Sequence, residues 1–360
     1  MRLKESLCLV LLAWHTAAVE ADQRFRVGVI APLSGPLAEY GLAAQNGIEL
    51  ARSQNSNIFS KIDFLYEDSQ WDAKQSVSAF NKLRDIEKVQ AVFNWGNPTT
   101  EAVAPIAEQS KLPLIGMTLD PSVAMGRQYV IRSTNSAGDF AAAIGHYLRS
   151  QGYKQMGVVI AANTYVQGLF DGLKHSVGND ISIDIIDRYN LGDQDFRATV
   201  SKVRARKYDA IGIFLITGQV SSFYRQLAQQ GVALPTFGTD FFESSTEIKM
   251  AAGGMNGSVY SHLGITEQFR KDYTARFKND YQIAYAGNAY DMAVVLGSLF
   301  NRSGDLTSEQ IMSKLKSVTL HKGIGGEFSF VETPTAGPHY HFPVEIKKII
   351  GEDITVVARG

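Results

Sequence analysis

A pattern of strand, turn and helix occurs twice in this 360-residue sequence, and the duplication constrains the fold more than any other feature. Residues 156–161 (MGVVIA) are similar to residues 27–31 (VGVIA), and each run precedes a short loop and a predicted helix that starts near Tyr40 or Tyr165. Further pairs follow in the same order: 62–66 with 183–187, 91–93 with 210–214, and 112–116 with 234–238. This shared order indicates two copies of one structural unit.

The strands of both units are continuous apolar runs, and helical stretches of ten or more residues separate them. Such strands are typical of parallel sheets that are covered by helices on both faces. The chain is also longer than the roughly 250 to 300 residues that one hydrophobic core usually spans. The sequence therefore predicts an α/β fold with two doubly wound parallel-sheet lobes.

The first 21 residues have the pattern of a secretory signal peptide. Arg2 and Lys4 precede the short apolar run of residues 7–13, and Val19 and Ala21 are the small residues of a cleavage site. The run is far shorter than the roughly 20 residues that cross a bilayer. Removal of this segment would also remove Cys8, the only cysteine, which suits an oxidising compartment. We expect a soluble, periplasmic protein.

Charge and motifs exclude several classes of function. The chain has 35 Lys and Arg against 36 Asp and Glu, so its formal charge of −1 offers no basic field for nucleic acid. The sequence contains no phosphate-binding loop, no GxGxxG after the first strand, and no GxSxG, HExxH or CxxC motif. We therefore expect a protein that is not an enzyme and needs no cofactor.

The loops after the strands predict where a ligand binds. In open parallel sheets, ligands gather at the carboxyl ends of the strands, and two such units facing each other would form a cleft. The loops supply one acid, Asp240, hydroxyls on residues such as Thr99 and Thr118, and an aromatic wall formed by Tyr40, Trp95, Tyr165, Phe241 and Phe242. Aromatic walls with few polar groups suit a small organic ligand.

At these residues the chain resembles the periplasmic solute-binding proteins of the leucine/isoleucine/valine-binding type. The resemblance rests on the order and spacing of several motifs across nearly all of the chain beyond residue 21. They are VGVIAPLSGP at 27–36 with YG at 40–41, YEDS at 66–69, TTEAVAPIA at 99–107, LPL at 112–114, GTD at 238–240, and YA at 285–286 with AYD at 289–291.

The resemblance implies two lobes joined by a three-strand hinge, with crossings near residues 132–139, 260–264 and 332–339. Lobe 1 would comprise residues 22–135 and 263–335, and lobe 2 would comprise residues 136–262 and 336–360. It further implies a monomer that captures a small molecule and delivers it to the membrane permease of an ABC uptake system. A ligand-sensing subunit of a signalling system is the alternative role.

The resemblance also implies roles for individual residues. Asn97, Thr99 and Thr118 would bind the carboxylate of an amino acid, Asp240 its ammonium group, and Tyr165 would cover it. Tyr40, Trp95 and Phe241 favour an apolar or aromatic side chain. Asn97 and Pro98 stand where amino-acid binders usually have serines, and the loop at 117–121 is about one residue short. Binding of an aromatic carboxylate or amide by the same cleft is therefore the alternative.

Several of these residues also have a purely structural interpretation. Thr99 and Thr100 could cap a helix, Trp95 and Phe242 could belong to the core, Tyr165 could pack at a lobe edge, and Asp240 could cap a short helix. Glu67, Asp68 and Asp72 lack the spacing of a calcium loop and are expected to form a solvated surface. His339 and His341 are expected to form no metal site, because no third ligand stands near them in the sequence.

Overall fold

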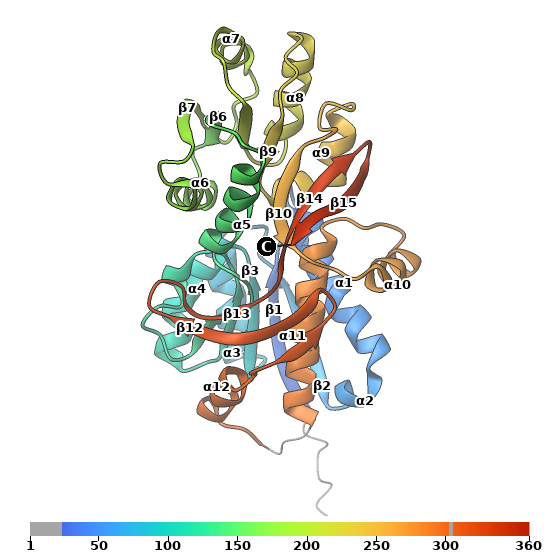
Figure 1. The fold of residues 1–360 in the computed structure, drawn as a ribbon. Helices are drawn as coiled ribbons and strands as arrows, with labels where there is room; N and C mark the ends of the chain where they lie inside the picture. Colours follow the sequence, from blue (N-terminus) through green and yellow to red (C-terminus); the bar gives the residue numbers. More distant parts are fainter. Residues whose placement is uncertain (1–23, 302–304, 360) are drawn as a thin grey trace, which may run out of the picture.

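The computed structural model describes residues 24–301 and 305–359, and it contains two β-sheets, each flanked by helices (Figure 1). The order of the first sheet is β11-β12-β13-β5-β4-β3-β1-β2, and that of the second is β15-β14-β10-β9-β8-β6-β7. Read from the other edge, both sheets begin with the same arrangement of five strands, β2-β1-β3-β4-β5 and β7-β6-β8-β9-β10. The duplication and the fold class predicted from the sequence are confirmed.

The first sheet is covered on both faces. Helices α1 and α11 pack together against one face, where they bury residues such as Val27 and Val29. Helices α3 and α4 pack on the other face over Ile30 and Val92. The strands are β1 (Phe25–Ala31), β2 (Ile62–Asp68), β3 (Ala91–Trp95), β4 (Leu114–Met117), β5 (Val130–Arg132), β11 (His321–Gly323), β12 (Gly326–Thr333) and β13 (Gly337–His341). The helices of this lobe are α1 (Ala38–Gln54), α2 (Ser56–Phe59), α3 (Ala73–Asp85), α4 (Asn97–Ser110), η1 (Pro121–Val123), α10 (Glu267–Phe277), α11 (Ile283–Asn301) and α12 (Ser308–Lys316).

The second sheet repeats this plan with its own helices, and α5 packs closely on α6. Its strands are β6 (Gln155–Ala161), β7 (Ser182–Tyr189), β8 (Ala210–Phe214), β9 (Thr236–Gly238), β10 (Val259–Leu263), β14 (Val344–Ile350) and β15 (Asp353–Arg359). Its helices are α5 (Ala137–Ser150), α6 (Thr164–Val177), α7 (Arg197–Ala205), α8 (Gln219–Gln229), η2 (Asp240–Glu243) and α9 (Ser245–Met250).

The sheets are mainly parallel but not wholly so, because the last strands run antiparallel at one edge of each. Strand β12 pairs antiparallel with β13, and β14 pairs antiparallel with β10 and β15. Among the described residues, no helix combines the length and the apolar character needed to cross a membrane. The expected signal peptide, residues 1–21, lies outside the part of the chain that the structure describes.

The chain passes between the sheets after β5, after β10 and after β13. The third passage comes later than expected, because β13 (Gly337–His341) pairs in parallel with β5 in the first sheet. The first and third passages are paired: Asn135 donates from Nδ2 to the carbonyl of Phe342 at 3.0 Å, and its Oδ1 accepts from the Phe342 N–H at 2.9 Å. A Pro- and Gly-rich stretch at 332–339 suggested a linker, but the tertiary structure makes part of it a strand.

One buried carboxyl in this core should make stability depend on pH. Asp291 of α11 is 2% exposed, and among the described residues it accepts hydrogen bonds only from the N–H of Ile324, at 3.1 and 3.2 Å. Burial raises the pKa of Asp291 from 3.8 to about 8. Between pH 3.8 and about 8, the folded state holds a proton that the unfolded state has released. The contribution of this proton to the free energy of unfolding is therefore complete below pH 3.8 and falls as the pH rises toward about 8.

We expect Asp291→Asn to remove this dependence. The free energy of unfolding of the unmodified chain should fall by up to about 1.4 kcal/mol per pH unit between those values, because one proton is linked to folding. Urea titrations at pH 5 and pH 8 measure the difference, and the exposed Asp353→Asn serves as a control that should keep the slope. An equal slope in Asp291→Asn and in the unmodified chain would contradict the assignment.

Candidate functional site

A cavity of about 310 Å³ lies between the two lobes, where loops after strands of both sheets meet. Its volume is within the range of small-molecule pockets. Six aromatic residues line it: Tyr40, Trp71, Trp95, Tyr165, Phe241 and Tyr285. The rest of the lining is mostly aliphatic or uncharged, with Leu37, Met117, Leu119, Leu191, Gly96, Asn97, Pro98, Asn163 and Thr164.

Asp240 is the one charged side chain among the described residues that line this cavity. It is 5% exposed, at the start of η2. Its Oδ1 accepts a hydrogen bond from the hydroxyl of Tyr165 in α6, and its Oδ2 accepts one from the hydroxyl of Tyr285 in α11 at 2.5 Å. A carboxylate has about four lone-pair positions, so these two bonds leave acceptor capacity for a ligand.

Both phenols donate to Asp240 because they remain protonated. Burial, reinforced by the negative charge of Asp240, raises the pKa of Tyr165 and of Tyr285 well above the usual value of 10.0. Tyr165 belongs to the second lobe and Tyr285 to the first, so Asp240 ties the two lobes together. Tyr40 adds a second contact between the lobes, with its hydroxyl 3.3 Å from Oγ1 of Thr217.

The aromatic rings form a connected wall. The ring centroid of Tyr40 lies 5.3 Å from Trp95, 5.8 Å from Tyr285 and 6.1 Å from Phe241, and Phe241 lies 5.8 Å from Tyr165. Tilted and edge-to-face pairs at these distances stabilise one another beyond their burial. The wall is therefore a fixed apolar surface that contains one acidic group.

Another polar feature of the cavity is the start of α4. Gly96 precedes the helix with φ of +101°, a conformation that favours glycine, and Pro98 has no N–H. The N–H groups of Asn97 and Thr99 donate to no other described residue. Unpaired N–H groups and the helix dipole make a helix N-terminus a favourable place for an anion.

Two residues predicted to bind a ligand carboxylate do not line the cavity. The hydroxyl of Thr99 donates to the carbonyl of Trp95 at 2.5 Å and lies 2.9 Å from the carbonyl oxygen of Gly96. The hydroxyl of Thr118 donates to Oδ1 of Asn97 at 2.6 Å. Both side chains are fully buried. Their hydroxyls hold the loop and the first turn of α4 in place, so the interpretation of Thr99 as a structural residue of this helix fits better than direct ligand contact.

The structure places the other predicted residues at the cavity, namely Tyr40, Trp95, Asn97, Tyr165, Asp240 and Phe241. Phe242 is the exception, because it is fully buried and packs on Tyr224 and Tyr260, as its core interpretation expected. Asp240 does not cap a helix, since the caps of η2 and α9 are Thr239 and Ser244.

Sequence reasoning did not assign Trp71 and Tyr285 to the site. Trp71 and its neighbour Gln70 both have the left-handed conformation, with φ of 58° and 48°, which is uncommon for residues with a side chain. Such strain persists only where surrounding structure fixes it, and it often marks a functional position. Tyr285 is 45 residues from Asp240 in the chain, so no local pattern pairs them.

A buried ion pair lies close to Asp240 in the chain. Oε2 of Glu243 lies 2.8 Å from Nζ of Lys347 and accepts a hydrogen bond from Tyr260 at 3.1 Å. Both charged side chains are 2% exposed. Burial acts to raise the pKa of Glu243, but the attraction of Lys347 and of nearby His262 outweighs it and lowers the pKa to about 2.

The acidic residues of the β2–α3 region have local partners. Glu67 pairs with Lys82 at 2.6 Å, Asp68 accepts from the hydroxyl of Ser34, and Asp72 caps α3. No third ligand stands near His339 and His341 in the sequence, but the fold brings Asp139 of α5 close to them.

Comparison with known proteins agrees with this architecture. Residues 24–348 match the family model of a periplasmic binding protein. This chain belongs to the periplasmic binding protein family. It is therefore a solute-binding protein of the kind that serves ABC transporters, and not an enzyme.

Individual relatives of this periplasmic binding protein cover most of both chains. It is 25% identical to the "Leu/Ile/Val-binding protein homolog 3" of Brucella melitensis over 340 residues, which are 90% of this chain and 89% of the relative. Its fold matches the branched-chain amino acid binding protein LivJ of Streptococcus pneumoniae, in complex with isoleucine, with a TM-score of 0.82 and 21% identity over 93% and 99% of the two chains.

A second solved structure with the same fold holds a different ligand. It is a solute-binding protein of an ABC transporter from Rhodopseudomonas palustris in complex with 3,4-dihydroxybenzoic acid. Its TM-score is 0.82, with 18% identity over 94% of this chain and 97% of that chain. Proteins with this fold thus bind ligands as different as isoleucine and 3,4-dihydroxybenzoic acid.

Proposed function

We propose that this periplasmic binding protein captures an amino acid with an apolar or aromatic side chain and delivers it to the membrane permease of an ABC transporter. The observation that carries the proposal is the buried carboxylate of Asp240, the one charged side chain that the described residues contribute to this aromatic cavity. A buried carboxylate without a cationic partner is costly, and a ligand ammonium group would supply that partner.

The N-terminus of α4 supports the presence of a carboxylate group in the ligand. Asn97 lines the cavity, and its free N–H at the start of α4 offers an anion site on the wall contributed by the first lobe. Asp240 belongs to the wall contributed by the second lobe. A zwitterion would therefore engage both lobes, and its side chain would lie against Tyr40, Trp95 and Phe241.

An aromatic carboxylate is the second candidate, and the aromatic wall together with the hydroxybenzoate complex of a protein with the same fold favours it. A carboxylate could occupy the α4 N-terminus equally well. However, no lysine, arginine or histidine of the described residues lines the cavity, and such a ligand would leave Asp240 without a cation. The amino acid therefore fits the site better.

A matched ligand screen tests the proposal. L-phenylalanine, 3-phenylpropionate and phenethylamine differ only in their amine and carboxylate, and L-leucine, 4-methylpentanoate and isoamylamine repeat the comparison without the ring. A ligand that binds only the folded state raises the melting temperature. We expect shifts from the amino acids alone. Binding of 3-phenylpropionate, benzoate or 4-hydroxybenzoate in preference to every amino acid would reject the amino-acid assignment and favour the second candidate.

Closure of the lobes completes the proposal. We propose that lobe 1 and lobe 2 move as rigid bodies about the chain passages near residues 133–136, 264–266 and 342–343, which is the usual way that hinged lobes bury a ligand. A monomer released to the periplasm by cleavage of residues 1–21 would perform this role. Selective delivery to a signalling partner instead of a permease would leave the binding chemistry unchanged.

A further inference from the structure

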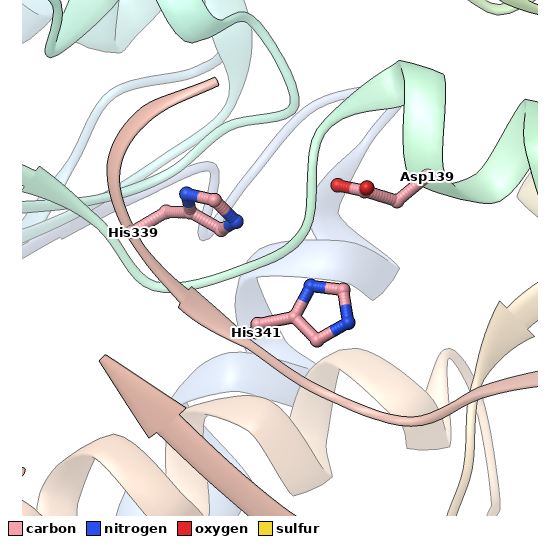
Figure 2. Close-up of side chains that lie close together, drawn as sticks. All are labelled: Asp139, His339 and His341. Carbon is pink, nitrogen blue, oxygen red and sulfur yellow. The ribbon is translucent and has the colours of Figure 1, made fainter. Parts of the chain in front are cut away.

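Three side chains with metal-ligand chemistry meet where the chain passes between the lobes. His339 and His341 lie on β13 of the first sheet, and Asp139 lies in the first turn of α5, which packs against the second sheet. One ligand atom from each residue lies within 4.8 Å of the other two. In Figure 2 the carboxylate of Asp139 is directed from α5 toward the two imidazole rings. The cluster is separate from the cavity that contains Asp240.

The hydrogen bonds of the cluster leave ligand atoms available. His339 is 2% exposed, and its Nδ1 lies 3.0 Å from the carbonyl of Gly337, to which it donates in the tautomer that leaves Nε2 free. Histidines that bind metals usually donate their other N–H to such a partner, which fixes the ring and its tautomer. Within the described residues, the carboxylate of Asp139 accepts hydrogen bonds only at Oδ2, which lies 2.7 Å from the backbone nitrogen and 2.7 Å from the hydroxyl oxygen of Ser136, so Oδ1 remains available.

His341 is the residue of this cluster whose ring can rotate most easily. Its side chain is exposed. Among the described residues its ring makes one long hydrogen bond, 3.3 Å between its Nδ1 and Nδ2 of Asn135, and an edge contact with the ring of His339 at a centroid distance of 6.1 Å. Ligand atoms about 2.0–2.1 Å from a tetrahedral metal lie roughly 3.3 Å apart. The separations in the cluster do not exceed 4.8 Å, and a rotation of the exposed His341 ring is the least costly way to bring the ligand atoms to the spacing that a metal requires.

We propose that Asp139, His339 and His341 bind a divalent transition metal, with Zn²⁺ as the best match. Two imidazoles and one carboxylate are ligands that Zn²⁺ accepts, with water at the fourth position. The three ligands carry one negative charge, that of Asp139, which balances part of the charge of the ion. Because Asp139 belongs to one lobe and the histidines to the other, a bound ion would hold the two lobe-crossing segments together.

One neighbouring charge opposes the ion. The guanidinium of Arg132 is buried, and it donates to the carbonyls of Thr134, Asn135 and Ala336, at distances of 3.1, 3.1 and 2.7 Å. Its positive charge lowers the pKa of His339, in addition to the larger effect of burial. The repulsion from Arg132 reduces the affinity of the cluster for a cation. The site should therefore favour ions that bind imidazole strongly over Ca²⁺ or Mg²⁺.

The test is calorimetric titration of the chelator-treated protein with Zn²⁺ alone, repeated with Mg²⁺. We expect saturable binding of one Zn²⁺ per chain and none of Mg²⁺. His341→Ala changes an exposed residue and should leave folding intact, but it should reduce Zn²⁺ affinity by at least about tenfold, since even the loss of an outer partner has such an effect. Asp139→Asn keeps an acceptor for Ser136 and should also weaken binding. His146→Ala, an exposed histidine on the same helix, is the matched control.

Absence of one-to-one Zn²⁺ binding would overturn the proposal. So would binding that survives both His341→Ala and Asp139→Asn unchanged, or that His146→Ala abolishes, because the ion would then be held elsewhere. A metal-free melting curve of each variant shows whether a loss of binding reflects a loss of folding. These titrations use no organic solute. The metal-site proposal and the amino-acid assignment are therefore tested independently.

Discussion

Asp240→Asn is expected to weaken the binding of the amino-acid ligand by about 2–5 kcal/mol, or roughly 30-fold to several thousandfold. The substitution retains the shape of the side chain and an oxygen that can accept from Tyr165 or Tyr285, but it removes the negative charge. The ligand ammonium group would then be buried in an aromatic cavity without a counter-charge, which is the source of the large effect.

Calorimetric titration with the amino acid found in the ligand screen measures this change. Asp180→Asn is a control of the same chemistry at an exposed position of the second lobe, and it should leave affinity unchanged. Affinity for any carboxylate analogue that lacks the amine should not fall in Asp240→Asn. If the variant binds the amino acid as tightly as the unmodified chain does, the ammonium does not lie at Asp240 and the amino-acid assignment fails.

Lys347→Met is expected to reduce the free energy of unfolding by about 3–5 kcal/mol, because it leaves the carboxylate of Glu243 buried without its cation. Both partners are 2% exposed and lie 2.8 Å apart. The double variant Glu243→Gln with Lys347→Met should lose less than Lys347→Met alone, since no buried charge is left unpaired. Urea unfolding at pH 7 measures each value.

The pH dependence of the same pair has a defined sign. The folded-state pKa of Glu243, about 2, is below its ordinary value of 4.5. The stabilisation by the Glu243–Lys347 pair is therefore fully present above pH 4.5 and is lost as the pH falls toward about 2. Lys202→Met breaks the exposed pair with Asp187 and should change the free energy of unfolding by less than about 1 kcal/mol. Equal effects of Lys347→Met and Lys202→Met would show that the buried pair contributes no more than a surface one.

The general location of the site could be predicted from the sequence, but not all of its contacts. Asp240 and Phe241 line the cavity, and a sequence pattern can place them near it because they follow a buried strand and the carboxyl ends of parallel strands share one edge. Thr99 and Thr118 follow strands as well, but their hydroxyls bond to nearby carbonyl and amide oxygens and do not reach the cavity. A sequence pattern places a residue near an edge, whereas the direction of its side chain depends on the partners that it finds there.

The sequence alone determined the local features of this protein, whereas the tertiary structure determined the contacts between distant segments. The apolar runs, turns and helical periods are local, and they sufficed to predict two α/β units and a ligand at their facing edges. The pairing of Asp240 with Tyr285, the strained position of Trp71, the inclusion of β13 in the first sheet and the approach of Asp139 to His339 and His341 arose only from tertiary structure. Each of these depends on the packing of neighbouring segments, often far apart in the chain, and local composition does not encode which atoms packing brings into contact.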